Sequence, residues 1–305
     1  MYMNMTEDTL NRARSIFNLL FGKAPPIAIR EVLEAVLGLK CSRLNVRQTG
    51  LELMKSLSRE YGFGIAVSNW KIVPSSDSGK GDWSDGVAKY VPADDPEGLF
   101  SVYLGKTNTE AVKALEAETL LGDDAFGEIL GIPLCCRCFY LDRRQRALSS
   151  GNDYLWETLD DELLNQAAPA GANIIAQYFG RCLLSHFPCR LHCRASRMAS
   201  ATRRKVLSLV APQFADYLAE SHFWTTVVLR GRGMVAYPQA IINETQVQPD
   251  KNVVSIVIGE VPSSFTEADV LFVDREDYVV AENHGNVVAR EPRSGARLVI
   301  IENIW

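Results

Sequence analysis

The spacing of apolar residues changes along the chain, and each change marks a region with a different expected structure. In the first sixty residues, apolar positions in "IREVLEAVLG" and "TGLELMKSLSREYGFG" recur as on one face of an amphipathic helix. Segments 65–73 and 99–106 are rich in β-branched or alternating apolar residues, which predicts strands. Residues 1–106 are therefore expected to form an α/β region.

The helical period dominates residues 107–225. It is clearest in "NTEAVKALEAETLLG", in "ANIIAQYFGRCLLSHF" and in the segment that includes "CRLHCRASRMASATRRKVLSLV". The last of these is expected to start near Pro188, because proline has no amide hydrogen to lose at the first helical position. This stretch contains most of the cysteines, so we expect a helical, Cys/His-rich middle region.

From residue 226 the apolar period becomes two. "TTVVLRGRGMVAY", "VVSIVIGEV" and "DVLFVDREDYVVAEN" are short apolar or alternating segments, and "HGN" and "PRSG" are typical of turns. Residues 226–305 are expected to form a barrel-like antiparallel β module. The predicted fold class is α+β, with an N-terminal α/β region, a helical metal-binding middle and this C-terminal β module.

Composition and charge restrict the function classes. The 305-residue chain is 47% hydrophobic and has a net charge of -5, which disfavours nucleic acid as a partner. No apolar run reaches the roughly 18 residues that span a bilayer. The N-terminal segment has acidic residues ahead of its apolar stretch and lacks a small-residue cleavage site, so no signal peptide is indicated. We expect a cytoplasmic protein without a membrane partner.

Clustered cysteines are the strongest chemical feature. Six of the seven cysteines lie between residues 135 and 193. In a cytoplasmic chain such clustering favours metal binding or redox chemistry over structural disulfides. Cys189 and Cys193 are four residues apart, so on a helix they would share a face and bind one metal ion from adjacent turns. Cys41 and Cys182 are expected to be core residues.

A tetrahedral site needs two further ligands. Adjacent cysteines on a helix diverge by roughly 100°, so one of Cys135 and Cys136 is expected to point inward, and Cys138 has a similar difficulty. Which of the three binds stays open. His186 is expected to complete the set, with His192 as the alternative histidine.

Zinc is the metal that a Cys/His set of this kind usually binds. Iron, or an iron–sulfur cluster held by thiolates, is the alternative. Two other interpretations stay open: buried cysteines without any metal, since cysteine is among the most buried residue types, and a redox or disulfide pair.

Two stretches around the cysteines resemble the signature of an uncharacterised microbial family, LGYP-x-CC followed by H-x-P-C-x-x-x-C-x-x-S. They are "FGEILGIPLCCRCF" and "HFPCRLHCRAS", under a tenth of the chain, with Ile132 in place of an aromatic residue and an additional Cys138. The sequence is also similar to accessory peptide-binding proteins of ribosomal-peptide natural-product pathways, such as the crocagin pathway. The resemblance implies a shared architecture, a role in natural-product biosynthesis and the site residues Cys135, Cys136, His186, Cys189 and Cys193.

Basic residues accompany the second cysteine pair. The chain has no acidic residue between Glu162 and Asp216. On a helix, Arg190, Arg194 and Arg197 would form a stripe that could bind an acidic peptide, a carboxylate-rich ligand or phosphate. The alternative is that the stripe packs against the acidic "DDEL" or "DREDY" segments of the same chain.

Known catalytic motifs are missing: the chain has no H-E-x-x-H, no G-x-S-x-G and no dinucleotide fingerprint. We therefore expect a metal-stabilised accessory protein that binds a peptide or an acidic partner protein, for example by strand addition to a sheet edge. A homodimer is an alternative partner. The alternative function is a metal-dependent enzyme, zinc hydrolase-like or an iron or iron–sulfur oxidoreductase, and a thiol redox enzyme is a third hypothesis.

Overall fold

The structure is a computed structural model whose described residues form two compact units. The structure describes residues 5–74, 87–149, 154–160 and 168–229, and the shorter segments 233–238, 241–243, 246–248, 254–257, 265, 268, 270–273, 278–283, 286–292, 296–299 and 301–302. Among the described residues, unit 1 comprises those in 5–74, 87–145 and 199–218, and unit 2 comprises those in 146–198 and 219–302. The division into three regions at residues 106 and 225 stays a prediction.

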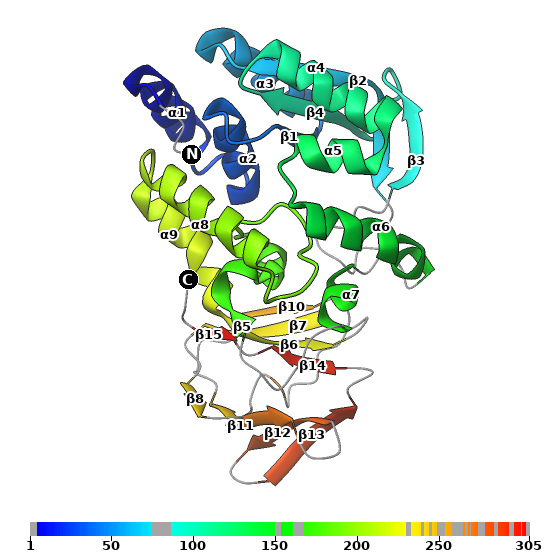
Figure 1. The fold of residues 1–305 in the computed structure, drawn as a ribbon, viewed down its shortest axis with the longest axis vertical. Coiled ribbons are helices and arrows are strands. Elements are labelled where there is room, and N and C mark those ends of the chain that lie inside the picture. Colours follow the sequence, from blue (N-terminus) through cyan, green and yellow to red (C-terminus); the bar gives the residue numbers. More distant parts are fainter. Residues whose placement is uncertain are drawn as a thin grey trace. The chain divides into compact units, whose positions relative to one another are not determined.

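Unit 1 is built on a four-stranded antiparallel sheet with the order β1-β4-β2-β3 (Figure 1). Its strands are β1 (Ser42–Val46), β2 (Gly64–Pro74), β3 (Val87–Pro92) and β4 (Leu99–Gly105). Strands β2 and β4 coincide with the two segments in which the sequence predicts strands, so that prediction is confirmed.

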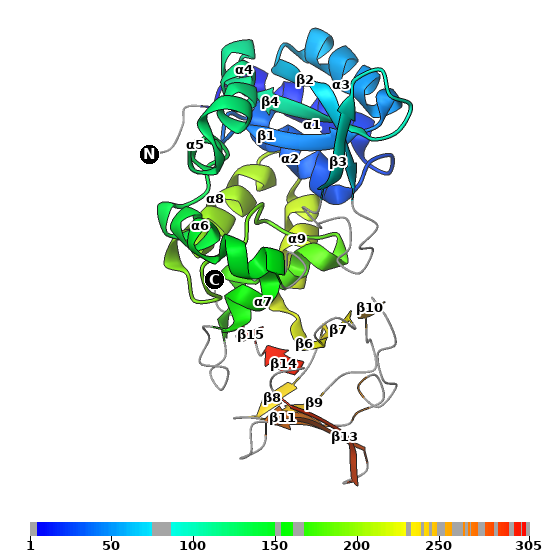
Figure 2. The ribbon, with the colours of Figure 1, turned by 90° about the vertical axis from the view of Figure 1, so that its right-hand side faces the viewer.

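Helices cover both faces of this sheet (Figure 2). They are α1 (Glu7–Leu20), α2 (Pro26–Val36), α3 (Gln48–Tyr61), α4 (Asn108–Glu116), the π-helical turn η2 (Ala117–Leu121) and α5 (Asp123–Ile129). Tyr103 packs with Ala111 of α4, whereas its neighbours Val102 and Leu104 point to the opposite face because side chains alternate along a strand. Helices α2 and α3 also contact β4.

A group of buried charges ties α2 to the later helix α8 (Arg194–Ser208). Glu34 is fully buried, and its carboxylate oxygens lie 3.6 Å from Arg30 Nε, 3.4 Å from Lys40 Nζ and 3.4 Å from Arg203 Nε. Glu31 forms ion pairs with Arg30 and Lys40. Since charges out of contact with water need compensating partners, this network fixes the C-terminal half of α8 to α2.

The network also sets the ionisation of Glu31. Burial alone would raise the pKa of this carboxyl, but the positive charges of Lys40 and Arg30 outweigh burial and hold the pKa well below its ordinary value. A carboxyl whose pKa is lowered in the folded state contributes stability above its unfolded pKa, near 4.5. That contribution is lost as the pH falls below this value towards the lower folded pKa.

We therefore predict that Glu31→Gln lowers the free energy of unfolding at pH 7 by about 3–5 kcal/mol, because it leaves buried cations without their partner. Urea unfolding at pH 7 and pH 3 measures this. The difference between wild type and variant should shrink at pH 3, and an equal difference at both pH values would contradict the role of the network. Glu52→Gln, at the exposed Glu52–Lys55 pair, is the control with a small effect.

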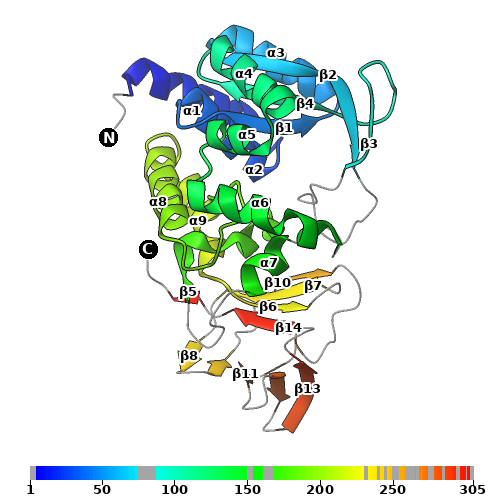
Figure 3. The same cartoon turned by 45° about the vertical axis from the view of Figure 1, so that its right-hand side comes forward.

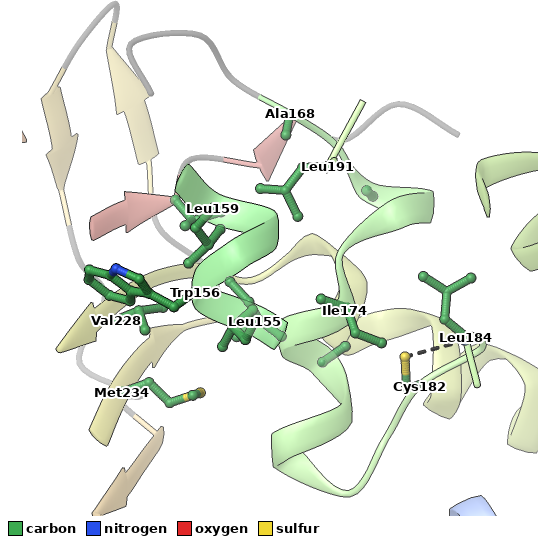
Figure 4. Close-up of a cluster of buried hydrophobic side chains, with 14 residues drawn as sticks. Leu155, Trp156, Leu159, Ala168, Ile174, Cys182, Leu184, Leu191, Val228 and Met234 are labelled. Atoms are coloured by element: carbon green, nitrogen blue, oxygen red, sulfur yellow. Dashed lines mark hydrogen bonds between the residues drawn. The ribbon is translucent and has the colours of Figure 1, made fainter. Parts of the chain in front are cut away.

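Unit 2 contains a four-stranded antiparallel sheet that lies between helices on one face and a second sheet on the other (Figure 3). In β6, Val227 and Leu229 pack with Leu271 of a second sheet, whereas Val228 between them points to the other face and packs with Leu155 of α7 (Tyr154–Asp160). Figure 4 shows the cluster that contains Leu155 and Val228, in which strand and helix residues interdigitate. Because this strand packs on both faces, all five residues of "TTVVL" are buried, the two threonines included.

The first sheet has the order β10-β7-β6-β14 and the second the order β13-β12-β11-β9-β8. The strands are β6 (Thr225–Leu229), β7 (Gly233–Tyr237), β8 (Ile241–Asn243), β9 (Gln246–Gln248), β10 (Val254–Val257), β11 (Val270–Val273), β12 (Tyr278–Asn283), β13 (Asn286–Pro292) and β14 (Ala296–Val299). A short parallel pair joins β5 (Ala168–Pro169) to β15 (Ile301–Glu302). The α+β class is confirmed, but in the described residues the strands form separate open sheets rather than a closed barrel.

The segment "ANIIAQYFGRCLLSHF" is not the regular helix that its period predicts. It contains the 3₁₀ helices η3 (Ala170–Ala172) and η4 (Ile174–Phe179), followed by irregular backbone. The buried His222 explains part of this: its Nε2 accepts the Leu183 amide hydrogen at 2.8 Å and its Nδ1 donates to the Ala170 carbonyl at 3.1 Å. Backbone groups that a helix would pair internally are used by a side chain instead. Cys182 lies in the core, as expected, and so does Cys41.

The remaining helices are α6 (Leu134–Ser149), α9 (Pro212–Glu220) and the 3₁₀ helix η5 (Ser221–Phe223). With 16 residues, α6 is the longest helix in the described part of the chain. None of the described helices has the length and apolar character needed to cross a membrane. The cytoplasmic location stays a prediction.

Candidate metal centre

The first two cysteines lie in the first turn of α6. The carbonyl of Pro133 accepts the amide hydrogens of Cys136 at 2.9 Å and Arg137 at 3.0 Å, so the helix begins directly after the proline. Cys136 is 1% exposed, whereas Cys135 is exposed. Their Sγ atoms are 3.8 Å apart. Both thiols therefore lie at a helix N-terminus, where the backbone presents positive partial charge.

The end of helix α5 determines where the first turn of α6 begins. Helix α5 ends in a Schellman motif, in which the Ile132 amide donates to the Gly127 carbonyl and the Gly131 amide to the Glu128 carbonyl, both at 2.9 Å. Gly131 has a φ of 68°, a left-handed conformation that glycine adopts without strain. Pro133 then starts α6. The "GIP" of the sequence is thus the stop of one helix and the start of the next.

The sequence predicts that Cys189 and Cys193 share one helix face, and this prediction is wrong. Helix α8 begins at Arg194 rather than near Pro188, and residues 190–193 form a turn in which the Cys193 amide donates to the Arg190 carbonyl at 3.0 Å. The Pro188 carbonyl, which would start a helix there, instead accepts the buried Thr158 hydroxyl at 2.9 Å. The turn, not a helix, brings Cys189 towards Cys193.

Cys193 occupies the N-cap position of α8. Its carbonyl accepts the first helical hydrogen bond, from the Arg197 amide at 3.0 Å, and its Sγ accepts the Ser196 amide hydrogen at 3.5 Å. The side chain thus replaces the hydroxyl or carboxylate that usually accepts at a helix start. An N–H···S contact and a helix N-terminus both stabilise a thiolate, the form that binds metals.

The structure brings four thiols together. The Sγ atoms of Cys135, Cys136, Cys189 and Cys193 all lie within 4.8 Å of one another, an arrangement that could hold a metal ion. Four sulfurs at the zinc–sulfur distance of about 2.3 Å around a tetrahedral ion would be about 3.8 Å apart. The 3.8 Å between the Sγ atoms of Cys135 and Cys136 equals one edge of such a tetrahedron.

Both adjacent cysteines therefore join the group, although a helical divergence of roughly 100° predicts that only one would. The divergence applies to the Cα–Cβ directions, and the Cβ–Sγ bonds can turn towards a common point. Cys138 is exposed and lies outside the group. His192 also lies outside it.

His186 lies behind the four thiols rather than among them. It is 6% exposed, and its Nε2 is 2.9 Å from the hydroxyl oxygen of Ser196. Ser196 is fully buried and donates its amide hydrogen to Cys193 Sγ. His186 and Ser196 thus form a buried pair that supports a thiol, the kind of outer contact that orients metal ligands.

The three predicted basic residues do not form one helical stripe. Arg190 lies in the turn before α8, so only Arg194 and Arg197 are on the helix. Arg190 and Arg194 are exposed and Arg197 is half-buried. Within the part of the chain that the structure describes, none of the three forms an ion pair. The acidic segments considered as their partners fall largely outside the described residues.

Comparison with protein-family models, with curated proteins and with solved structures finds no match to this chain.

Ser196 and Thr158 are the site residues that sequence reasoning missed. A serine three residues after a capping cysteine is at the position whose amide points at the cap, so the spacing Cys193-x-x-Ser196 could have indicated it. Thr158 has no such pattern, because its partner Pro188 is distant in the sequence and accepts through its backbone.

We predict that Ser196→Ala weakens zinc binding about tenfold, the lower end of the effect usual for outer contacts of a metal site. The variant keeps the backbone N–H that faces Cys193 but loses the hydrogen bond to His186. Competition with a chelator of known affinity measures the change. Ser208→Ala, which removes a hydroxyl at the far end of the same helix, should leave the affinity unchanged. Equal affinities of wild type and Ser196→Ala would contradict a supporting role.

Proposed function

We propose that this protein is a metal-stabilised binding protein that holds one zinc ion through Cys135, Cys136, Cys189 and Cys193. The observation that carries the proposal is the convergence of four Sγ atoms within 4.8 Å from two segments far apart in the sequence. Thiols this close without metal would repel one another once ionised. A divalent ion removes that repulsion and bonds all four.

Zinc is favoured over an iron–sulfur cluster by the short sulfur–sulfur distances. In a [4Fe–4S] cluster each cysteine sulfur binds a different iron atom, and in a [2Fe–2S] cluster two cysteines bind each iron. Sulfurs on different iron atoms lie farther apart than the edge of one tetrahedron. A separation of at most 4.8 Å between all pairs fits a single ion. Among single ions, zinc is the usual partner of four thiolates in a tetrahedron, and mononuclear iron is the alternative that metal analysis distinguishes.

A structural role is favoured over a catalytic one. Catalytic zinc sites keep one coordination position for water or substrate, whereas structural sites fill all four positions with protein ligands. Four thiols are available here, and two of them, Cys136 and Cys193, are buried at 1% and 3% exposure. The ion would link the start of α6 to the turn before α8 and so stabilise both segments.

The test is the metal content of the purified full-length chain. We expect one zinc per chain, loss of zinc in Cys189→Ser, and a fall in melting temperature of that variant because metal binding contributes to folding. Cys138→Ser, which changes an exposed cysteine outside the group, should keep its zinc. A wild-type chain without zinc that is equally stable in a chelator would refute the proposal.

A second observation favours an acidic partner. Arg190 and Arg194 are exposed, and neither forms an ion pair within the described residues. Arginine binds carboxylates through two parallel hydrogen bonds, so an acidic peptide suits this surface.

We predict that the double variant Arg190→Gln/Arg194→Gln binds a polyglutamate peptide about tenfold more weakly, because each exposed charge pair contributes up to about 1 kcal/mol. Titration at low and high salt measures this, with weaker binding at high salt. Arg47→Gln/Arg59→Gln removes two exposed arginines elsewhere and is the matched control. Absence of binding at either salt concentration, or equal losses in both variants, would contradict the acidic-partner hypothesis.

A further inference from the structure

A C-x-x-C sequence, Cys135 to Cys138, opens α6. Cys135 belongs to the group of four thiols, and Cys138 lies outside it. Both residues are exposed, whereas Cys136 and Cys193 are buried. The chain therefore carries one accessible candidate ligand and one accessible spare thiol on the same helix.

Helix geometry places these two thiols within reach of one another. Residues three apart on an α-helix have Cα atoms about 5 Å apart, inside the range of about 4.4–6.8 Å that disulfides need. Their Cβ atoms, about 5–6 Å apart, must approach by about 1–2 Å to reach the roughly 3.8 Å of a disulfide. The first turn is already partly tightened in this way, because the Cys136 amide donates to the carbonyl three residues earlier, that of Pro133, at 2.9 Å.

We propose that Cys135 and Cys138 form a redox switch that releases the metal, an inference that rests on the zinc site proposed above. Formation of the Cys135–Cys138 disulfide removes one of four ligands from the ion. The three thiols that remain hold zinc less firmly, so oxidation empties the site and reduction restores it.

The oxidant that this chemistry requires is a hydroperoxide. The Cys135 sulfur attacks one peroxide oxygen, the O–O bond breaks, and the departing hydroxide or alkoxide takes up a proton. Cys135 is then a sulfenic acid. The Cys138 thiolate attacks that sulfur, the S–S bond forms, the S–O bond breaks, and hydroxide leaves as water. Two thiols are oxidised to a disulfide, and the peroxide is reduced.

Other thiol pairs are less suited to this reaction. Cys135 and Cys136 are adjacent, and consecutive Cα atoms are about 3.8 Å apart, below the range for an unstrained disulfide. Cys193 is 3% exposed and its sulfur accepts the Ser196 amide hydrogen, so a Cys189–Cys193 reaction would need access to a buried atom. Among the four grouped thiols only Cys135 is exposed, which makes it the site of attack.

The experiment treats the zinc-loaded full-length chain with hydrogen peroxide. Released zinc is followed with a colorimetric chelator, and disulfides are mapped by peptide mass spectrometry. We expect stoichiometric zinc release, a Cys135–Cys138 disulfide, and recovery of zinc binding after dithiothreitol. Cys138→Ser should bind zinc as wild type does but release it at least about tenfold more slowly, and its product should be a sulfinic acid that dithiothreitol does not reverse.

The outcomes separate the two proposals. If the untreated chain holds zinc but peroxide yields no Cys135–Cys138 disulfide, the switch is wrong and the zinc site stands. Equal rates and equal reversibility of release in wild type and Cys138→Ser lead to the same conclusion. A reduced chain that binds no zinc overturns both proposals.

Discussion

The crowding of four thiols within 4.8 Å of one another is the constraint on which the proposed site depends. Sulfurs held within 4.8 Å of one another are stable as anions only around a cation. Three of these sulfurs lie at helix starts: Cys135 and Cys136 are in the first turn of α6, and Cys193 caps α8. Both helix ends present positive partial charge to the sulfurs. The exposed Arg190 and Arg194 directly follow Cys189 and Cys193 in the sequence.

Contacts around the four thiols fix the two backbone segments that carry them. The Gly131 helix stop and Pro133 fix where α6 begins. The Thr158 hydroxyl donates to the Pro188 carbonyl. At the start of α8, the Ser196 hydroxyl contacts His186, and the Ser196 amide donates to Cys193 Sγ. Each of these contacts is buried or lies at a helix end, where a change of one residue moves a ligand. The site is therefore the product of two short, strongly determined backbone segments.

Much of the fold followed from period and composition, and the failures have physical causes. Strands β2 and β4 and the α+β class were predictable because local alternation matched tertiary burial. The helix expected from Pro188 failed because Thr158, distant in the sequence, binds the carbonyl that would start it. The helix expected around Leu183 failed because His222 takes its backbone hydrogen bonds. Long-range polar contacts of this kind leave no periodic pattern.

The cysteines were predictable as a group but not in their arrangement. Cys189 and Cys193 were expected to meet on a helix and instead meet through a turn, while Cys135 and Cys136 both join the group although helix geometry suggested one. X-ray absorption at the zinc edge of the purified chain tests the central claim most directly. We predict four sulfur neighbours at about 2.3 Å; a spectrum with nitrogen or oxygen neighbours at about 2.0–2.1 Å would contradict a four-cysteine site.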